Sequence, residues 1–69
     1  MYENIERLIF EKKLKKSDIA HAIGITYNTL LLKLSGKYKF TLDEAVALRN
    51  FLDPDMSIEE LFKTEYIPA

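Results

Sequence analysis

Three polar side chains stand at the start of a predicted helix. Thr26, Tyr27 and Asn28 precede Leu30 and Leu34, which have the four-residue spacing of a buried helical face. A threonine in this place is a good N-cap, and an asparagine amide both donates and accepts hydrogen bonds. On an exposed helix, such an amide can make the paired contact that distinguishes adenine in the major groove of DNA.

A tight corner must position this helix. Ile19, Ala20 and Ile23 form one stripe of a preceding helix, and the small Ala20 allows a second helix to approach closely. Gly24 follows, and a residue without a Cβ can adopt the left-handed conformation that ends a helix. Residues 16–36 are therefore predicted to form two short helices joined at Gly24.

Lysines flank this helix pair on both sides. Before the pair, the ammonium groups of Lys12, Lys13, Lys15 and Lys16 repel one another unless an anion lies opposite. The alternative is a solvated lysine-rich loop. In the turn after the pair, a phenol between two ammonium groups suits contact with phosphate, and a plain surface loop is the alternative. The two groups are Lys12, Lys13, Lys15 and Lys16, around a core-filling Leu14, and Lys37, Tyr38 and Lys39, after Ser35-Gly36.

The distribution of charge is more informative than its sum. The formal net charge of −1, taken alone, argues against a nucleic-acid ligand. However, residues 1–39 hold eight basic and four acidic residues, whereas residues 40–69 hold two basic and seven acidic ones. Between Lys12 and Lys39, seven basic residues accompany a single acid. Positive charge is therefore concentrated in residues 1–39 and negative charge in residues 40–69.

Composition excludes several classes of function. The 69 residues predict one domain, 1–69, with a marginal core. The absence of cysteine excludes disulfides and thiolate metal sites, and the single His21 is assigned no role. No nucleophile elbow, glycine-rich phosphate loop or calcium-loop spacing is present, so we expect no enzyme activity, cofactor, metal or small-molecule ligand. No membrane segment or signal peptide is recognisable, and a cytoplasmic location is expected.

The remaining chain supplies the supporting helices. Ile5, Leu8 and Ile9 predict a first helix over residues 3–13. Phe10 is out of phase with them, and packing against the tail is favoured over an exposed anchor for a partner. Phe40 is expected in the core.

A fourth and a fifth helix are predicted after Phe40. Thr41 and Glu44 form a capping box before the fourth helix, and Pro54 marks the turn that follows it. The broad apolar face expected for the fourth helix comprises Leu42, Ala45, Val46, Leu48, Phe51 and Leu52. The short fifth helix is expected to pack through Ile58, Leu61 and Phe62.

These features resemble the lambda-repressor-like (Cro/XRE-type) helix-turn-helix family, in its compact phage and prophage repressor branch. The resemblance covers about residues 5–63 and implies an all-α fold of five helices, with the helix-turn-helix in the second and third. It also implies a transcriptional regulator that binds double-stranded DNA sequence-specifically. The matching positions are Ala20, Gly24, Ile25-Thr26, Leu30, Ser35-Gly36-Lys37, Phe40-Thr41-Leu42-Asp43-Glu44-Ala45 and Ser57-Ile58-Glu59-Glu60-Leu61-Phe62.

The resemblance also assigns roles to individual residues. Base contacts are expected from Tyr27, Asn28, Leu31 and Leu32, with the leucines meeting thymine methyl groups. Lys16 stands where the family usually has glutamine. Lys13 and Lys15 are expected to add long-range attraction. The phosphate contacts are expected from Lys16, Thr26, Ser35, Lys37, Tyr38 and Lys39.

Two further expectations concern partners. A homodimer on a palindromic operator is expected, with the fifth helix and Phe62, Tyr66 and Ile67 as the first candidate for its interface. The alternative is a protein-interaction adaptor that uses Leu30-Leu31-Leu32 on a protein groove. The lysines favour DNA, in the bacterial nucleoid or a phage-infected cell.

Overall fold

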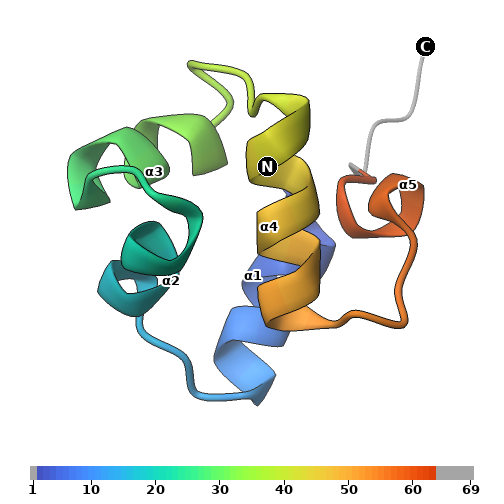
Figure 1. Ribbon diagram of the computed structural model, residues 1–69. Helices are drawn as coiled ribbons and strands as arrows, with labels where there is room; N and C mark the ends of the chain where they lie inside the picture. The colour runs from blue at the N-terminus through green and yellow to red at the C-terminus, as the bar shows by residue number, and fades with distance from the viewer. Residues whose placement is uncertain (1, 64–69) are drawn as a thin grey trace, which may run out of the picture.

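The computed structural model describes residues 2–63, which form five helices and no strand (Figure 1). α4 stands between the α2–α3 pair and α5, and it contacts α1, α2 and α5. The all-α, five-helix fold predicted from the sequence is thereby confirmed. None of these helices is long and apolar enough to cross a lipid bilayer. Their bounds are α1 Glu3–Glu11, α2 Lys16–Ile23, α3 Tyr27–Leu34, α4 Leu42–Leu52 and α5 Ile58–Leu61.

Every helix contributes to one core. The side chains with no exposed surface come from all five helices, so each element depends on the others for burial. Leu14, Ile25 and Phe40 lie between the helices and pack against this core as half-buried residues, as predicted for Leu14 and Phe40. The fully buried side chains are Ile5, Ile19, Leu30, Leu48, Leu52 and Leu61.

Three consecutive helices end by the same chain reversal. The reversing residues are Lys13, Gly24 and Gly36, with φ angles of 55°, 80° and 90°. In each case the following amide donates to a carbonyl of the helix's last turn, over 3.0, 3.0 and 3.1 Å. This pattern is the Schellman motif, which favours glycine at the reversing position. The corner predicted at Gly24 is confirmed, whereas Lys13 carries a side chain where glycine would be unstrained.

α3 and α4 begin at side-chain caps that the sequence predicted, whereas α1 and α2 have no side-chain cap. Thr26 Oγ1 accepts a hydrogen bond from Thr29 N at 3.1 Å and begins α3. Thr41 Oγ1 accepts from Glu44 N at 3.1 Å, and the Glu44 carboxylate accepts in return from Thr41 N at 3.0 Å. This reciprocal pair is the capping box expected at the start of α4.

An aromatic cluster joins distant parts of the chain. Tyr2, Phe40 and Phe62 pack edge to face, with ring centroids 5.2–5.8 Å apart. Phe62 is half-buried and packs within the domain, and its part in the dimer interface suggested by the sequence stays a prediction. The other two members of that interface, Tyr66 and Ile67, lie outside the described residues.

Three expectations about α1 and α4 were wrong. The first helix ends at Glu11 rather than at residue 13, because Lys13 reverses the chain. Phe10 is 83% exposed, so the favoured packing interpretation fails, and the alternative of an anchor for a partner stays a prediction. Leu42 and Phe51 are 72% and 40% exposed. The buried stripe of α4 is narrower than expected and comprises Ala45, Leu48 and Leu52.

Candidate nucleic-acid interface

α3 presents a distinct outer side. Leu30 and Leu34 are buried against the core, as their spacing predicted. Tyr27 is 48% exposed and Leu31 36%, and Asn28 is also exposed, whereas Leu32 is half-buried. The polar start of α3 therefore protrudes from the molecule, and three of the four predicted base-contacting side chains share exposed positions on this helix.

Two predicted phosphate-binding hydroxyls already hold the ends of α3. Thr26 Oγ1 also donates to Thr29 Oγ1 at 2.8 Å, in addition to accepting from the backbone. Ser35 Oγ donates to Leu32 O at 2.8 Å. Both residues are exposed, but each hydroxyl already donates its single proton within α3, so a phosphate would have to displace that acceptor.

Exposed cations lie in the turns before α2 and after α3. Lys37, Tyr38 and Lys39 are all exposed, with the tyrosine at 52%. Lys13 and Lys15 are exposed in the turn that precedes α2. Their ammonium groups can therefore reach a polyanion without displacing any partner within the described residues.

Lys16 differs from these lysines because it is half-buried and has a partner. Its Nζ lies 3.3 Å from Glu6 Oε1, so a carboxylate of α1 holds the cation at the first position of α2. The side chains of Lys16 and Glu6 are 32% and 42% exposed, so solvent screens the pair.

Two other lysines have partners within the domain, the buried Lys33 and the exposed Lys12. Lys33 is 9% exposed, and its Nζ donates to the Glu44 carboxylate. Lys12 Nζ donates to Leu52 O, at the C-terminal end of α4, where the helix dipole favours a cation. The seven lysines counted in the sequence thus overstate the basic surface by the buried Lys33, and the exposed lysines without a hydrogen-bond or ion-pair partner among residues 2–63 are Lys13, Lys15, Lys37 and Lys39.

The Glu44 carboxylate connects α3 to the start of α4. Its Oε1 receives both Lys33 Nζ and Thr41 N. The hydrogen bond from Lys33, followed by that from the Thr41 backbone, lowers the pKa of Glu44 below its ordinary value. Glu44 is therefore ionised at neutral pH, and Lys33 lies in a place where its charge is compensated.

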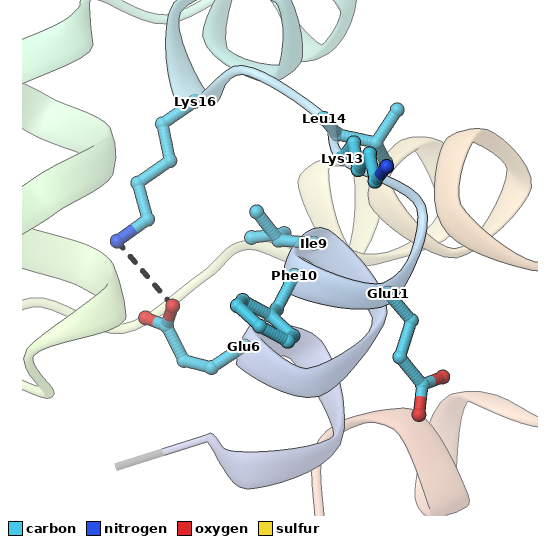
Figure 2. Close-up of a pocket in the computed structure, with 7 residues that line it drawn as sticks. All are labelled: Glu6, Ile9, Phe10, Glu11, Lys13, Leu14 and Lys16. Carbon is cyan, nitrogen blue, oxygen red and sulfur yellow. Dashed lines mark ion pairs between the residues drawn. The ribbon is translucent and has the colours of Figure 1, made fainter.

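A shallow groove of about 550 Å³ lies between α1 and the turn that leads to the start of α2. Figure 2 shows the Phe10 ring between the Lys16–Glu6 pair on one side and Glu11 and Lys13 on the other. The floor is apolar because Ile9 and Leu14 line it. Among the described residues, no group of three or more His, Asp or Glu side chains is placed to hold a metal ion.

The pattern of helices, caps and turn glycines has a counterpart among known families. A family model described as the Cro/C1-type HTH DNA-binding domain matches residues 4–66. The chain belongs to this family. No curated protein and no solved structure gives a significant match.

As a Cro/C1-type domain, the protein is a DNA-binding regulator whose helix-turn-helix is formed by α2 and α3. The sequence analysis identified this unit but missed the two ion pairs found among residues 2–63. One signal was available for Lys33, since it lies one helical turn after Leu30 and therefore on the buried side of α3. No comparable signal joins Lys16 to Glu6 across two helices.

Proposed function

We propose that this Cro/C1-type domain is a sequence-specific repressor or Cro-like regulator of phage or prophage origin. In this proposal the N-terminal half of α3 enters the major groove. The supporting observation is that Tyr27, Asn28 and Leu31 protrude from α3 while exposed lysines occupy the turns before α2 and after α3.

The base contacts follow from the chemistry of the exposed side. The Asn28 amide can donate to and accept from one adenine edge, a contact that contributes about 1–3 kcal/mol of discrimination. Leu31 is the apolar side chain best exposed for a thymine methyl group, and the half-buried Leu32 contributes at its edge. Tyr27 lies beside Asn28 and reaches either a base or the adjacent phosphate.

The phosphate contacts follow from the exposed cations and donors. One DNA strand is clamped by Lys37, Tyr38 and Lys39. Lys16, at the start of α2, binds another phosphate of the DNA backbone. Thr26 and Ser35 are weaker hydroxyl donors to phosphate. If about four to six phosphates are neutralised, the logarithm of affinity falls against the logarithm of salt concentration with a slope of about −4 to −5.

Two copies on a palindrome complete the proposal. A domain of this size reads few base pairs, and a dimer with half-sites about one helical turn apart doubles the contacted sequence. This arrangement predicts that selected sites contain inverted repeats.

The proposal is tested by selecting bound sequences from random duplex DNA at two salt concentrations. Asn28→Ala should relax preference at one position of the selected site, because its amide reads one base pair. Lys37→Ala should weaken binding to all sequences alike and make the salt slope shallower by about 1. An affinity that does not change with salt, or a selection without any preferred sequence, contradicts the proposal.

The protein-interaction adaptor is the second candidate, and one observation supports it. Leu31 is an exposed apolar residue next to Tyr27 on the same helix. However, Leu30 is fully buried and Leu32 half-buried, so the apolar outer surface is smaller than the three leucines suggested. The adaptor is preferred if Asn28→Ala and Lys37→Ala leave function intact while Leu31→Asp abolishes it.

A further inference from the structure

We propose that Lys33 and Glu44 are positioning residues that fix the phosphate-binding turn, residues 35–39, relative to α3. The inference rests on the proposed function, because it concerns how that turn meets DNA. Neither residue is placed to touch DNA itself: Lys33 is 9% exposed and the Glu44 side chain 17%.

The first step is the connectivity of the Glu44 carboxylate. It accepts from Lys33 in the last turn of α3 and from the backbone of Thr41, the residue that caps α4. One carboxylate therefore ties together the two ends of the turn. The segment between these ends carries Lys37, Tyr38 and Lys39, the exposed donors assigned to phosphate.

The second step is the cover over the ion pair. The Phe40 ring centroid lies 5.9 Å from Lys33 Nζ, and the same ring packs against Tyr2 and Phe62. Phe40 directly follows the turn, so the aromatic cluster fixes its last residue. Gly36 reverses the chain at the other end, where Lys37 N donates to Leu32 O at 3.1 Å.

The third step concerns what a buried ion pair contributes. Desolvation offsets much of its attraction, and a well-packed apolar pair often stabilises a fold equally well. An ion pair differs from an apolar pair in being directional, because the ammonium and the carboxylate must meet in one geometry. A turn held in this way binds phosphates without first being ordered, which favours affinity through preorganisation.

The experiment uses the full chain and a variant that neutralises the pair, Lys33→Met/Glu44→Gln. This change keeps the net charge, leaves no buried charge unpaired, and retains a side-chain oxygen for the capping box. Affinity for a random-sequence duplex is measured over a range of salt concentrations. Lys37→Ala/Lys39→Ala is then added to both the wild-type and the neutralised background.

In the wild-type background, Lys37→Ala/Lys39→Ala should make the salt slope shallower by about 2. Lys33→Met/Glu44→Gln alone should weaken DNA binding by about fivefold to tenfold. In that background, Lys37→Ala/Lys39→Ala should reduce the remaining affinity much less than it does in the wild type. NMR relaxation of the free protein should show greater backbone mobility at residues 36–39 in the neutralised variant.

Two results overturn the inference, and they are distinguishable. If the lysine changes cost the same in both backgrounds, the ion pair does not position the turn, and the proposed function stands. If the lysine changes have no effect even in the wild-type background, the turn does not bind phosphate, and both proposals fail. Should the double variant unfold at the assay temperature, Lys33→Gln/Glu44→Gln, which also leaves no buried charge unpaired, is tested in the same cycle, with the same two outcomes.

Discussion

Lys16 Nζ lies 3.3 Å from Glu6 Oε1, and the two side chains join the start of α2 to the middle of α1. The contact bears directly on DNA binding because Lys16 is a proposed phosphate ligand. An exposed pair of this kind contributes only about 0.2–1 kcal/mol, so a phosphate can displace the carboxylate at modest cost. Under the proposed function, Glu6 therefore competes with DNA for the Lys16 cation.

Replacing Glu6 should increase affinity for DNA. Glu6→Gln frees Lys16 and should raise affinity by about twofold to fivefold at low salt, with a smaller gain at high salt. Glu3→Gln removes the same charge from the same helix at an exposed position that has no ion pair within residues 2–63, and it serves as the matched control. Equal gains for both variants would mean that only net charge matters.

Replacing Lys13 should stabilise the fold. Its φ of 55° places a side chain in the left-handed region, which costs about 1 kcal/mol relative to glycine. Lys13→Gly should therefore raise the free energy of unfolding by about that amount in urea denaturation. Lys13→Ala removes the same charge but keeps the strain, so a similar gain for alanine would refute the conformational explanation.

Enlarging Ala20 should destabilise the helix pair. Ala20 is 2% exposed in α2, which packs against both α3 and α4. Ala20→Leu should cost about 1–3 kcal/mol by overpacking, which lowers Tm by about 4–8 °C per kcal/mol for a domain of this size. Ala22→Leu makes the same change at an exposed position of the same helix and should leave Tm nearly unchanged.

The stability of the α3–α4 junction should depend on pH. The hydrogen bonds from Lys33 and Thr41 lower the pKa of Glu44 below 4.5 in the folded state. Because the folded value lies below the unfolded one, this stabilisation is complete above about pH 4.5 and is lost as pH falls through the folded pKa.

Glu44→Gln separates this contribution from the rest of acid unfolding. The variant should be less stable than the wild type at pH 7, and the difference should shrink below pH 4.5. Glu59→Gln, at an exposed position in α5, should retain the wild-type pH dependence. A constant gap between Glu44→Gln and the wild type across this range contradicts the assignment.

The sequence predicted those parts of the fold that are encoded locally. Gly24, the Thr26 cap and the Thr41 capping box each depend on residues within a few positions of one another, and all three were confirmed. The same applies to the spacing of Leu30 and Leu34, which identified the buried side of α3.

The errors arose where burial depends on distant packing. Phe10 and Leu42 are large and apolar, but no element of the described chain covers them, and periodicity within one helix cannot show this. The partners of Lys12 and Lys33 lie on α4, far along the chain. The assignments of base and phosphate contacts stay predictions until binding is measured.

The aromatic contact of Tyr2, Phe40 and Phe62 has a practical consequence for engineering. It brings Tyr2 and Phe62, which lie near the two ends of the described residues, against Phe40, the residue that directly follows residues 35–39. A label introduced at Tyr2 or Phe62 would therefore disturb Phe40, the residue that directly follows Lys37, Tyr38 and Lys39, so both aromatic positions are best left unmodified. A reporter group is better attached at Phe10, whose ring faces solvent on the opposite end of α1.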